Sequence, residues 1–348
     1  MLDINNLRVK YETDADEAIH AVDGVDLTLR PNETLGLVGE SGCGKTTLAK
    51  SLINLLGRNG AIVDGTVEFK DRDLTSLSKR EMRNEIRWKE ISMIPQNAMN
   101  GFDPVYTVGK QIVQVIRHHE DDVTAAEAWT RARELFEQLG LEENRVKDYP
   151  HQFSGGMAQR AMIALAISLN PTVLLADEPT TALDVVIQNR ILKRIGELQS
   201  ELNSSMILVT HDMSVVAETC DRIAVMYGGR IVECADTETI LKNPQHPYTI
   251  GLRNAFPDIT ERSQELVSIP GAPPDLVDPA DQCRFAPRCP FAEEECWDAR
   301  PTAASGAHHR VECYRSDEAS MLRREGDDPE TWTTERQTDR RPLEADDD

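Results

Sequence analysis

The sequence contains no long apolar run, and this absence excludes a membrane span. Nowhere do about 18 consecutive residues stay apolar, which is the length that a transmembrane helix requires. The N-terminal stretch MLDINNLRV also lacks a basic region followed by an apolar one, so we expect no signal peptide. We therefore expect the chain to stay in the cytoplasm and to meet a membrane only by docking on a membrane protein.

Positive charge is scarce, and this excludes one class of partner. Of 348 residues, 60 are acidic and 38 are basic, which gives a net charge of −22, and only 10 of the basic residues are lysines. A general nucleic-acid binder needs a basic surface, so we expect no nucleic-acid partner. Acid-rich, lysine-poor surfaces stay solvated in concentrated salt, where charges are screened. A halophilic source is therefore one interpretation, and an ordinary acidic cytosolic protein is the other.

Closely spaced cysteine pairs are also missing. None of the seven cysteines stands in the C-x-x-C pair that is typical of zinc ribbons. Three cysteines, Cys43, Cys220 and Cys234, are scattered, whereas the other four cluster near the C-terminus: Cys283, Cys289, Cys296 and Cys313. In a reducing cytosol, such a cluster indicates a metal site more than disulfide bonds.

A glycine-rich segment near the N-terminus matches the P-loop pattern G-x-x-x-x-G-K-[ST]. Its residues are Gly39, Glu40, Ser41, Gly42, Cys43, Gly44, Lys45 and Thr46, followed by Thr47. Glycines allow the backbone N–H groups to point at phosphate oxygens, Lys45 adds positive charge for the β- and γ-phosphates, and the Thr46 hydroxyl can ligate Mg²⁺. We expect a buried strand over 33–38 and a helix over 46–56, whose N-terminal dipole faces the phosphates.

Polar residues follow three further apolar segments that we expect to be buried strands. Asp177 and Glu178 end the segment 173–177, where an aspartate can hold Mg²⁺ and a glutamate can act as a base toward water. His211 follows the segment 206–209, and Gln96 follows 91–94. Ligands of α/β sheets bind at the carboxyl ends of such strands, which makes His211 a candidate site residue.

Helical segments lie between these strands. Thr124 and Glu127 form a capping box before an amphipathic helix that ends near Leu139. Ser154, Gly155 and Gly156 precede a second apolar helix, and free N–H groups with a serine hydroxyl at a helix N-terminus can bind an anion. A glycine-containing helix cap is the alternative reading of this segment. The strand pattern of residues 1–34 includes Tyr11, which is either a base-stacking aromatic or a half-buried strand residue.

In this order and spacing, the motifs resemble the ATP-binding subunits of ABC transporters over roughly residues 1–240. The full set is Tyr11, the P-loop, Gln96, Ser154-Gly155-Gly156, Asp177-Glu178-Pro179, Ala182-Leu183-Asp184 and Thr210-His211-Asp212. The resemblance implies an α/β fold of the P-loop NTPase type. Its parts are a mixed sheet core, an antiparallel β subdomain, an inserted helical subdomain at about 97–170 and a small irregular C-terminal extension.

The resemblance also implies a role for each matching residue. Tyr11 would stack on adenine, and residues 39–46 would cradle the phosphates. Gln96 would touch Mg²⁺ and the attacking water, Asp177 would support Mg²⁺, Glu178 would be the general base and His211 would sense the γ-phosphate. Ser154, Gly155 and Gly156 would cap ATP bound to the opposite subunit, and Asp184 would lie between the two sites. Met157 departs from the glutamine found in many members.

The C-terminal region narrows the resemblance to oligopeptide/dipeptide importers, through His246-Pro247-Tyr248-Thr249 and the segment from Cys283 to Pro290. Such importers usually combine two different ATPase subunits, two permeases and an extracytoplasmic solute-binding protein. In some members four cysteines hold a [4Fe–4S] cluster, and Cys283, Cys289, Cys296 and Cys313 match in number and order. Zinc, with His308 and His309 as possible substitute ligands, and no metal are the alternatives. We expect a cluster to be mainly structural and remote from ATP.

The expected organisation is an ATP-binding domain over 1–240, a four-cysteine extension over 241–315 and an acidic, disordered tail over 316–348. The expected function is ATP hydrolysis with Mg²⁺ that drives peptide import at the cytoplasmic face of the membrane, with nickel or oligosaccharides as alternative solutes. A redox-sensing module is another reading. ABC ATPases that act on ribosomes or DNA usually carry a second ATPase domain or long coiled coils, and this chain has neither.

Overall fold

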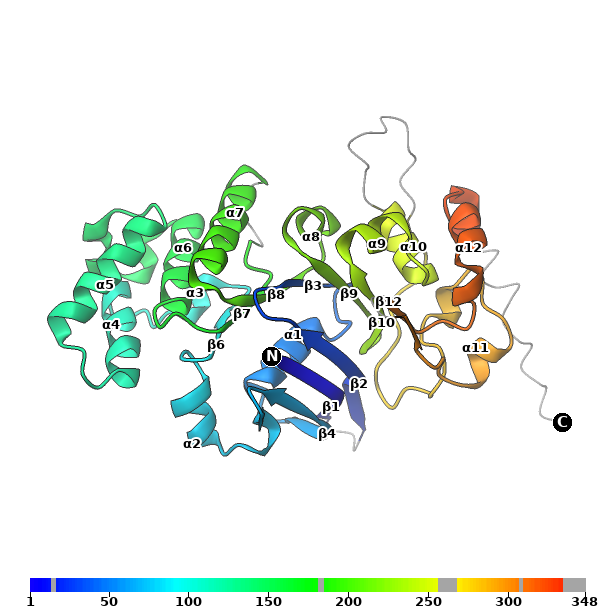
Figure 1. Cartoon of the computed structure of the whole chain (residues 1–348), viewed down its shortest axis with the longest axis horizontal. Helices are drawn as coiled ribbons and strands as arrows, with labels where there is room; N and C mark the ends of the chain where they lie inside the picture. Colours follow the sequence, from blue (N-terminus) through cyan, green and yellow to red (C-terminus); the bar gives the residue numbers. More distant parts are fainter. Residues whose placement is uncertain (14–16, 181–184, 256–267, 307–308, 334–348) are drawn as a thin grey trace.

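The computed structural model describes residues 1–13, 17–180, 185–255, 268–306 and 309–333. Along the long axis of the molecule, a group of helices lies at one end, two β-sheets lie in the middle and the C-terminal segment lies at the other end (Figure 1). Of the helices in these ranges, none is both long and apolar enough to cross a membrane.

The first sheet is antiparallel and has the order β2-β1-β4-β5. Its strands are β1 (Leu2–Glu12), β2 (Ala18–Leu29), β4 (Gly60–Phe69) and β5 (Arg72–Asp73). In β1 the apolar side chains at alternating positions are buried, among them Leu2, Ile4, Leu7 and Val9. This alternation is the one expected of a sheet that covers the core with one face, and it confirms the strand prediction for the N-terminal segment.

The second sheet is mixed and has the order β11-β12-β10-β9-β3-β8-β7-β6. Its strands are β3 (Thr34–Val38), β6 (Ile91–Ile94), β7 (Val173–Asp177), β8 (Ser205–Thr210), β9 (Arg222–Tyr227), β10 (Arg230–Asp236), β11 (Ala304–Ser305) and β12 (His309–Val311). The neighbours β3, β8, β7 and β6 pair in parallel. Their carboxyl ends therefore meet at one edge, which is where ligands of such sheets bind.

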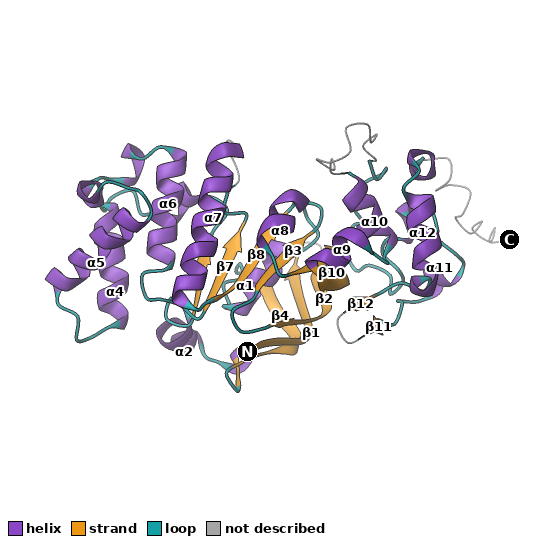
Figure 2. Ribbon diagram, turned by 45° about the horizontal axis from the view of Figure 1, so that its top comes forward, coloured by secondary structure: helices purple, strands orange, loops and turns teal. Residues whose placement is uncertain are grey.

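Helices cover the mixed sheet and form the end group (Figure 2). They are α1 (Lys45–Leu52), α2 (Lys79–Glu81), α3 (Ala98–Gly101), α4 (Val108–His119), α5 (Ala125–Gln138), α6 (Gly155–Ala166), α7 (Val185–Leu202), α8 (Met213–Thr219), α9 (Thr237–Lys242), α10 (Pro247–Asn254), α11 (Glu295–Asp298) and α12 (Ala319–Gly326). The capping box before α5 is confirmed, with Thr124 and Glu127 bonded reciprocally at 2.9 and 3.3 Å. Helices α3 to α6 gather at one end of the molecule.

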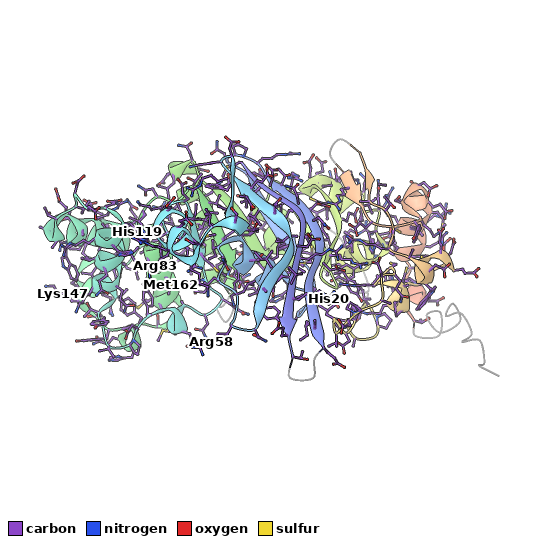
Figure 3. All side chains as sticks on the ribbon, turned by 90° about the horizontal axis from the view of Figure 1, so that it is seen from below. His20, Arg58, Arg83, His119, Lys147 and Met162 are labelled. Carbon is purple, nitrogen blue, oxygen red and sulfur yellow. The ribbon has the colours of Figure 1, made fainter. Side chains whose placement is uncertain are left out.

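The C-terminal segment joins the mixed sheet at its edge. Strand β12 pairs with β10, so that Val311 lies opposite Glu233 and His309 lies opposite Ala235. On the other side, the segment reaches the first sheet, where Nε2 of His20 lies 3.2 Å from Oδ1 of Asp278; His20 is labelled on its strand in Figure 3. The irregular extension is therefore tied to both sheets by hydrogen bonds.

The expectation of a disordered tail was wrong over the residues that the structure describes. From 316 onward the chain forms α12 and a 3-10 turn over Pro329–Trp332. Leu322 and Trp332 are buried, and the Trp332 indole donates to the Gly326 carbonyl over 2.8 Å. The sequence around these residues is mostly charged, so its few apolar side chains, which pack against α10, did not indicate a folded segment. Residues 334–348 lie outside the described ranges.

Candidate functional site

The P-loop follows β3 and enters α1, as the sequence predicts. The Lys45 ammonium is buried and donates to two carbonyl oxygens of the same loop, at 2.7 Å to Gly39 and 2.8 Å to Glu40. Gly44 has φ of 107°, and a Cβ atom there would lie 2.1 Å from the Ala21 carbonyl oxygen. Only glycine fits that position, because any larger residue would meet backbone in a conformation that side chains rarely adopt.

A hydroxyl and a carboxylate suited to Mg²⁺ meet beside the P-loop. Thr46 Oγ1 donates a 2.9 Å hydrogen bond to Asp177 Oδ1, across the carboxyl ends of β3 and β7. Asp177 is only 2% exposed, and burial raises the pKa of its carboxyl group. Hard cations such as Mg²⁺ take oxygen ligands of this kind. The pair therefore fits the cation that the P-loop pattern implies.

Glu178 lies at the centre of a second group of polar side chains. Its Oε2 accepts a 2.8 Å hydrogen bond from the Gln96 amide, and its Oε1 lies 3.3 Å from Nδ1 of His211. Glu178 has φ of 45°, a left-handed conformation that is uncommon for a residue other than glycine. Strained backbone of this kind concentrates at functional sites, where the surrounding structure holds it. The structure thus brings together three residues that the sequence placed at three different strand ends.

Tyr11, at the end of β1, lies on the other side of α1. Its hydroxyl is 3.5 Å from Thr47 Oγ1, and its ring packs against Gly60, where a Cβ atom would come within 2.5 Å of a ring carbon. The ring is half-buried. This position agrees with either of the two readings of Tyr11.

The Ser-Gly-Gly segment lies apart from the P-loop. Ser154 is the N-cap residue of α6, and Ser154 and Gly156 line a cavity of about 560 Å³ between α6 and α7. Basic side chains that the sequence analysis missed border the same cavity: Arg160, Arg190, Lys193 and Arg194. They were not recognisable in the sequence because two different helices supply them. Asp184 lies outside the described residues.

The four clustered cysteines meet around one small cavity. Cys283, Cys289, Cys296 and Cys313 line it together with aromatic side chains, and no carboxylate does so. Burial and the neighbouring sulfur atoms raise the pKa of these thiols, to about 11 for Cys283 and about 12 for Cys313. Thiols with high pKa values become good ligands only when a bound cation stabilises the thiolate. His246 and Arg315 line the same cavity, so the thiols are not its only polar side chains.

A site for a single metal ion is not formed in the part of the chain that the structure describes. No group of three or more histidine, cysteine, aspartate or glutamate side chains there could hold a metal ion. His309, one of the two possible zinc ligands, is 2.7 Å from Glu233 Oε1 through its Nε2. His308, the other, falls outside the described ranges. The metal prediction for the four cysteines, whether iron–sulfur or zinc, thus gains no support from the described residues.

The extension is not remote from the ATP site, which corrects the expectation. Tyr248 in α10 accepts a 3.0 Å hydrogen bond from the Glu40 backbone N–H, in the middle of the P-loop. Arg288, the residue before Cys289, binds the Glu40 carboxylate through two hydrogen bonds of 2.7 and 3.0 Å. The sequence carried no signal for these contacts, which join positions more than 200 residues apart.

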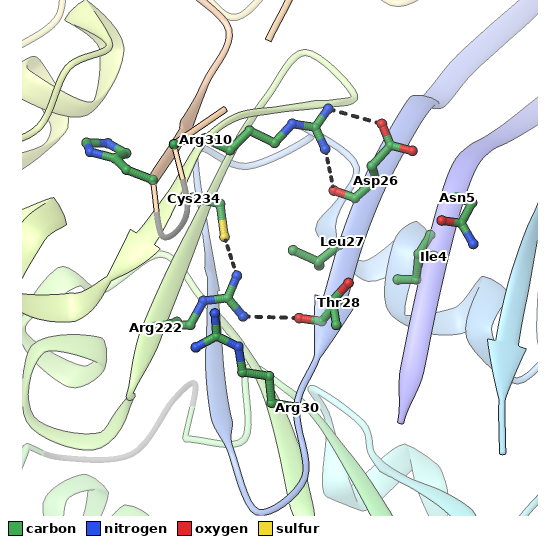
Figure 4. Close-up of a pocket in the computed structure, with 11 residues that line it drawn as sticks. Ile4, Asn5, Asp26, Leu27, Thr28, Arg30, Arg222, Cys234 and Arg310 are labelled. Atoms are coloured by element: carbon green, nitrogen blue, oxygen red, sulfur yellow. Dashed lines mark hydrogen bonds and ion pairs between the residues drawn. The ribbon is translucent and has the colours of Figure 1, made fainter. Parts of the chain in front are cut away.

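Another cavity, of about 230 Å³, lies between β2 and the strands β10 and β12 (Figure 4). Arg222 reaches the Thr28 carbonyl at 3.2 Å and the sulfur of Cys234 at 3.3 Å, while Arg310 binds the Asp26 carboxylate at 3.1 Å. These arginines bridge the two sheets. The cavity shares no lining residue with the P-loop, so we treat it as part of the seam between the sheets.

Residues 22–181 match the family described as ABC transporter, and residues 232–296 match the oligopeptide/dipeptide transporter C-terminal region. The chain belongs to the ABC transporter family. Relatives that support the assignment include a dipeptide transport ATP-binding protein of Lactococcus lactis subsp. cremoris, 45% identical over 84% of this chain and 84% of its own. An oligopeptide transport ATP-binding protein of Salmonella typhimurium is 42% identical over 90% of this chain and 93% of its own.

Solved structures agree with this assignment. A dimeric bacterial ABC transporter cassette matches with a TM-score of 0.62 and 28% identity, over 68% of this chain and 99% of its own. A dimeric cassette in a post-hydrolysis state, bound to ADP and Pi, matches with a TM-score of 0.62 and 27% identity, over 68% of this chain and 99% of its own. The predicted ABC ATPase fold is confirmed, and the protein is an ABC-type ATPase.

Proposed function

We propose that this ABC ATPase hydrolyses ATP to drive the import of peptides through a membrane permease. The observation that carries the proposal is the combination of a complete P-loop site with the C-terminal region of oligopeptide/dipeptide transporters. The most similar relatives named above transport dipeptides or oligopeptides. Nickel and oligosaccharides remain the alternative solutes, and we propose no nucleic-acid partner.

The hydrolytic roles follow from the geometry. Thr46 and Asp177 would hold Mg²⁺, which neutralises phosphate charge in the transition state. Lys45 would bind the β- and γ-phosphates with one N–H donor of its ammonium, because the loop carbonyls take two of the three donors and the third has only the weak acceptor Cys43 Sγ, at 3.7 Å. Glu178 would take the proton of the attacking water, while Gln96 and His211 hold its carboxylate in place.

A second ATPase subunit completes each site in this proposal. Ser154 and Gly156 line a cavity that includes no P-loop residue and is bordered by basic side chains, which favour an anion. An anion site at a helix N-terminus without a phosphate group of its own chain suits a nucleotide held by a partner. We propose that Ser154, Gly155 and Gly156 face the ATP bound to that partner, which is a second copy or a related chain. Asp184, outside the described residues, would lie between the two sites.

The membrane partners would dock near Gln96. The loop after Gln96 exposes three large apolar side chains to solvent: Met99 is 38% exposed, Val105 71% and Tyr106 39%. Apolar side chains gathered on one surface mark interaction sites. We propose that this loop meets two permease subunits at the cytoplasmic face of the membrane. An extracytoplasmic solute-binding protein would deliver the peptide.

We further propose that Cys283, Cys289, Cys296 and Cys313 hold a [4Fe–4S] cluster, with zinc as the alternative. Four thiols line their common cavity, together with His246 and Arg315 and with no carboxylate, and four thiolates are the donor set of such clusters. Binding energy from the group would add to the stability of an extension whose own apolar side chains, among them Tyr248, Ile250 and Phe285, are buried. The division into 1–240, 241–315 and an acidic tail is likewise a proposal, as is adaptation of the acidic surface to high salt.

Reconstitution tests the transport proposal. The chain, its neighbouring ATPase and permease gene products and their binding protein would be placed in proteoliposomes. We expect ATP hydrolysis to rise several-fold when the binding protein carries a dipeptide or oligopeptide, and not with Ni²⁺ or an oligosaccharide. Lys45→Ala serves as the inactive control. Stimulation by Ni²⁺ or a sugar instead of a peptide would reassign the solute, and repeating the assay at molar KCl tests the salt adaptation.

A further inference from the structure

The segment between Cys283 and Cys289 contacts the P-loop directly through Arg288 and indirectly through Arg284. Arg288 binds both carboxylate oxygens of Glu40, at 2.7 and 3.0 Å. Arg284 donates to the carbonyl oxygen of Gly228, and the next residue, Gly229, donates its N–H to the carbonyl oxygen of Cys43 over 2.9 Å. Both ends of the loop curve, Glu40 and Cys43, are thus connected to one short stretch of the extension.

Arg288 is itself held in a fixed geometry. Its side chain is 6% exposed, its Nε donates to the Pro270 carbonyl at 3.0 Å, and a terminal nitrogen donates to the Tyr227 hydroxyl at 3.3 Å. A further donor binds the Ile269 carbonyl at 3.2 Å, so three of the five N–H donors are taken and the other two point to Glu40 as a planar fork. The fork fixes the orientation of the carboxylate as well as its position.

Glu40 connects this fork to the phosphate-binding lysine. Its backbone N–H donates to the Tyr248 hydroxyl at 3.0 Å, and its carbonyl oxygen accepts from the Lys45 ammonium at 2.8 Å. A carboxylate in a phosphate-binding loop would repel a triphosphate unless a cation offset it. Arg288 is the cation that lies against Glu40, so it acts on both the shape and the charge of the loop.

We propose that Arg288 is a positioning residue for ATP binding, which acts through Glu40 to hold the P-loop and to neutralise its carboxylate. The proposal goes beyond the transport function and does not depend on the solute or on the group that the four cysteines hold. It makes the four-cysteine extension part of the ATP site rather than a separate module. Coupling of this kind is reciprocal, so ATP binding must also stabilise the segment that carries Arg288.

The test measures MgATP affinity of the purified full chain by displacement of a fluorescent ATP analogue. We expect Arg288→Ala to weaken binding about tenfold, as fits the loss of a partly buried charge-assisted pair that leaves Glu40 unpaired. Glu40→Gln should weaken it only about threefold, because the charge then left without its partner, on Arg288, is positive and attracts the phosphates instead of repelling them. The double variant Arg288→Ala/Glu40→Gln should bind like Glu40→Gln alone, and so better than Arg288→Ala. A merely structural role predicts no such rescue.

Arg310→Ala is the matched control. Arg310 also joins the extension to the ATP-binding part, through Asp26 on β2, but it does not touch the P-loop. Its loss should leave MgATP affinity within about twofold of the wild type, as usual for an exposed ion pair. A tenfold loss of MgATP affinity in Arg310→Ala would overturn the proposal. It would show that any loosening of the extension weakens ATP binding, whether or not the P-loop contact is kept.

A second measurement and a milder variant keep the proposal falsifiable if Arg288→Ala folds poorly. Tyr248→Phe deletes only the hydroxyl that accepts the Glu40 N–H, and we expect it to weaken MgATP binding about threefold. Hydrogen exchange at residues 283–289 should slow when MgATP binds the wild type, and should respond less in Arg288→Lys, which cannot form the fork. Any of three results would overturn the proposal. They are wild-type MgATP affinity in Tyr248→Phe, additive losses of affinity in the double variant, and hydrogen exchange at 283–289 that does not change when MgATP binds.

Discussion

The Gln96 amide donates a 2.8 Å hydrogen bond to the Glu178 carboxylate, between residues that are 82 positions apart. Gln96 follows β6 and Glu178 follows β7, and these two strands are parallel neighbours in the mixed sheet. The same Gln96 begins the loop that exposes Met99, Val105 and Tyr106. A displacement of that loop therefore reaches the proposed catalytic base directly, which offers a physical route between a docked permease and ATP hydrolysis.

Replacing Glu178 with glutamine should abolish ATP turnover while ATP still binds. Glutamine keeps the size of the side chain but cannot accept the proton of the attacking water, and loss of a general base typically costs about 10²–10⁴-fold in rate. Steady-state phosphate release and equilibrium ATP binding by the reconstituted complex measure the two effects separately. Near wild-type hydrolysis would show that another group takes the proton.

Replacing Ser154 with arginine should impair the nucleotide of the partner subunit. Ser154 lies in a cavity without P-loop residues, so a bulky side chain there should block closure on the other chain's ATP. Two mixed dimers would be compared. In the first, one chain carries both Ser154→Arg and Lys45→Ala and the other chain is wild type. In the second, one chain carries Ser154→Arg and the other carries Lys45→Ala. We expect a change in each chain to leave one intact site, because both defects then fall in the same site, whereas both changes in one chain should damage both sites. The reverse pattern would mean that Ser154 serves its own P-loop.

Replacing any of the four clustered cysteines with serine should remove the bound group. We expect anaerobically purified wild type to be brown, with broad absorption near about 400 nm, and each variant to be bleached. Cys220→Ser, which changes a buried cysteine outside the cavity, is the control and should keep the colour. Because Cys289 adjoins Arg288, Cys289→Ser should also weaken MgATP binding more than Cys313→Ser does.

The outcomes of the cysteine experiment separate three alternatives. Colourless anaerobic protein with stoichiometric zinc would refute the iron–sulfur cluster and keep a metal-stabilised extension. Metal-free protein whose amides over 283–313 are still protected from hydrogen exchange would refute both the cluster and the metal-stabilised extension. Transport that stays normal in a cluster-free variant would contradict the redox-sensing reading.

His246 should make the folded state less stable as the pH falls. Burial lowers the pKa of this imidazole from 6.5 to about 4, against the opposing charge of Glu233, and its Nδ1 accepts the Tyr248 N–H at 3.0 Å as a helix cap. Below pH 6.5 the unfolded chain takes up a proton that the folded chain does not, so the contribution is complete above that pH and is lost toward pH 4. Between pH 7 and pH 5 the loss should be about 2 kcal/mol.

Urea unfolding of the wild type and of His246→Asn at several pH values measures this effect. Asparagine also caps helices but does not titrate in this range, so the variant is a matched control. We expect the difference in unfolding free energy between the two proteins to shrink as the pH falls from 7 to 5. A constant difference would show that His246 is protonated equally in both states.

Local chemistry allowed the sequence alone to predict several parts of the site. The P-loop, the strand before it and the helix after it are set by backbone sterics, glycine and periodicity within about 20 residues. The same holds for the capping box of Thr124 and Glu127, and for the acid pair at the end of β7. Each of these signals is carried by neighbours in the chain, so spacing is enough to read it.

Only the tertiary structure decided which distant groups meet. Gln96, Glu178 and His211 converge because β6, β7 and β8 are adjacent parallel strands, and strand order depends on crossover packing rather than on spacing. Arg288 and Glu40 lie 248 positions apart. Helix α12 packs against α10, and its Leu322 is buried. Contacts of this kind depend on burial and on charged partners that other elements supply. A local pattern in the sequence does not identify those partners, because they are distant in the chain.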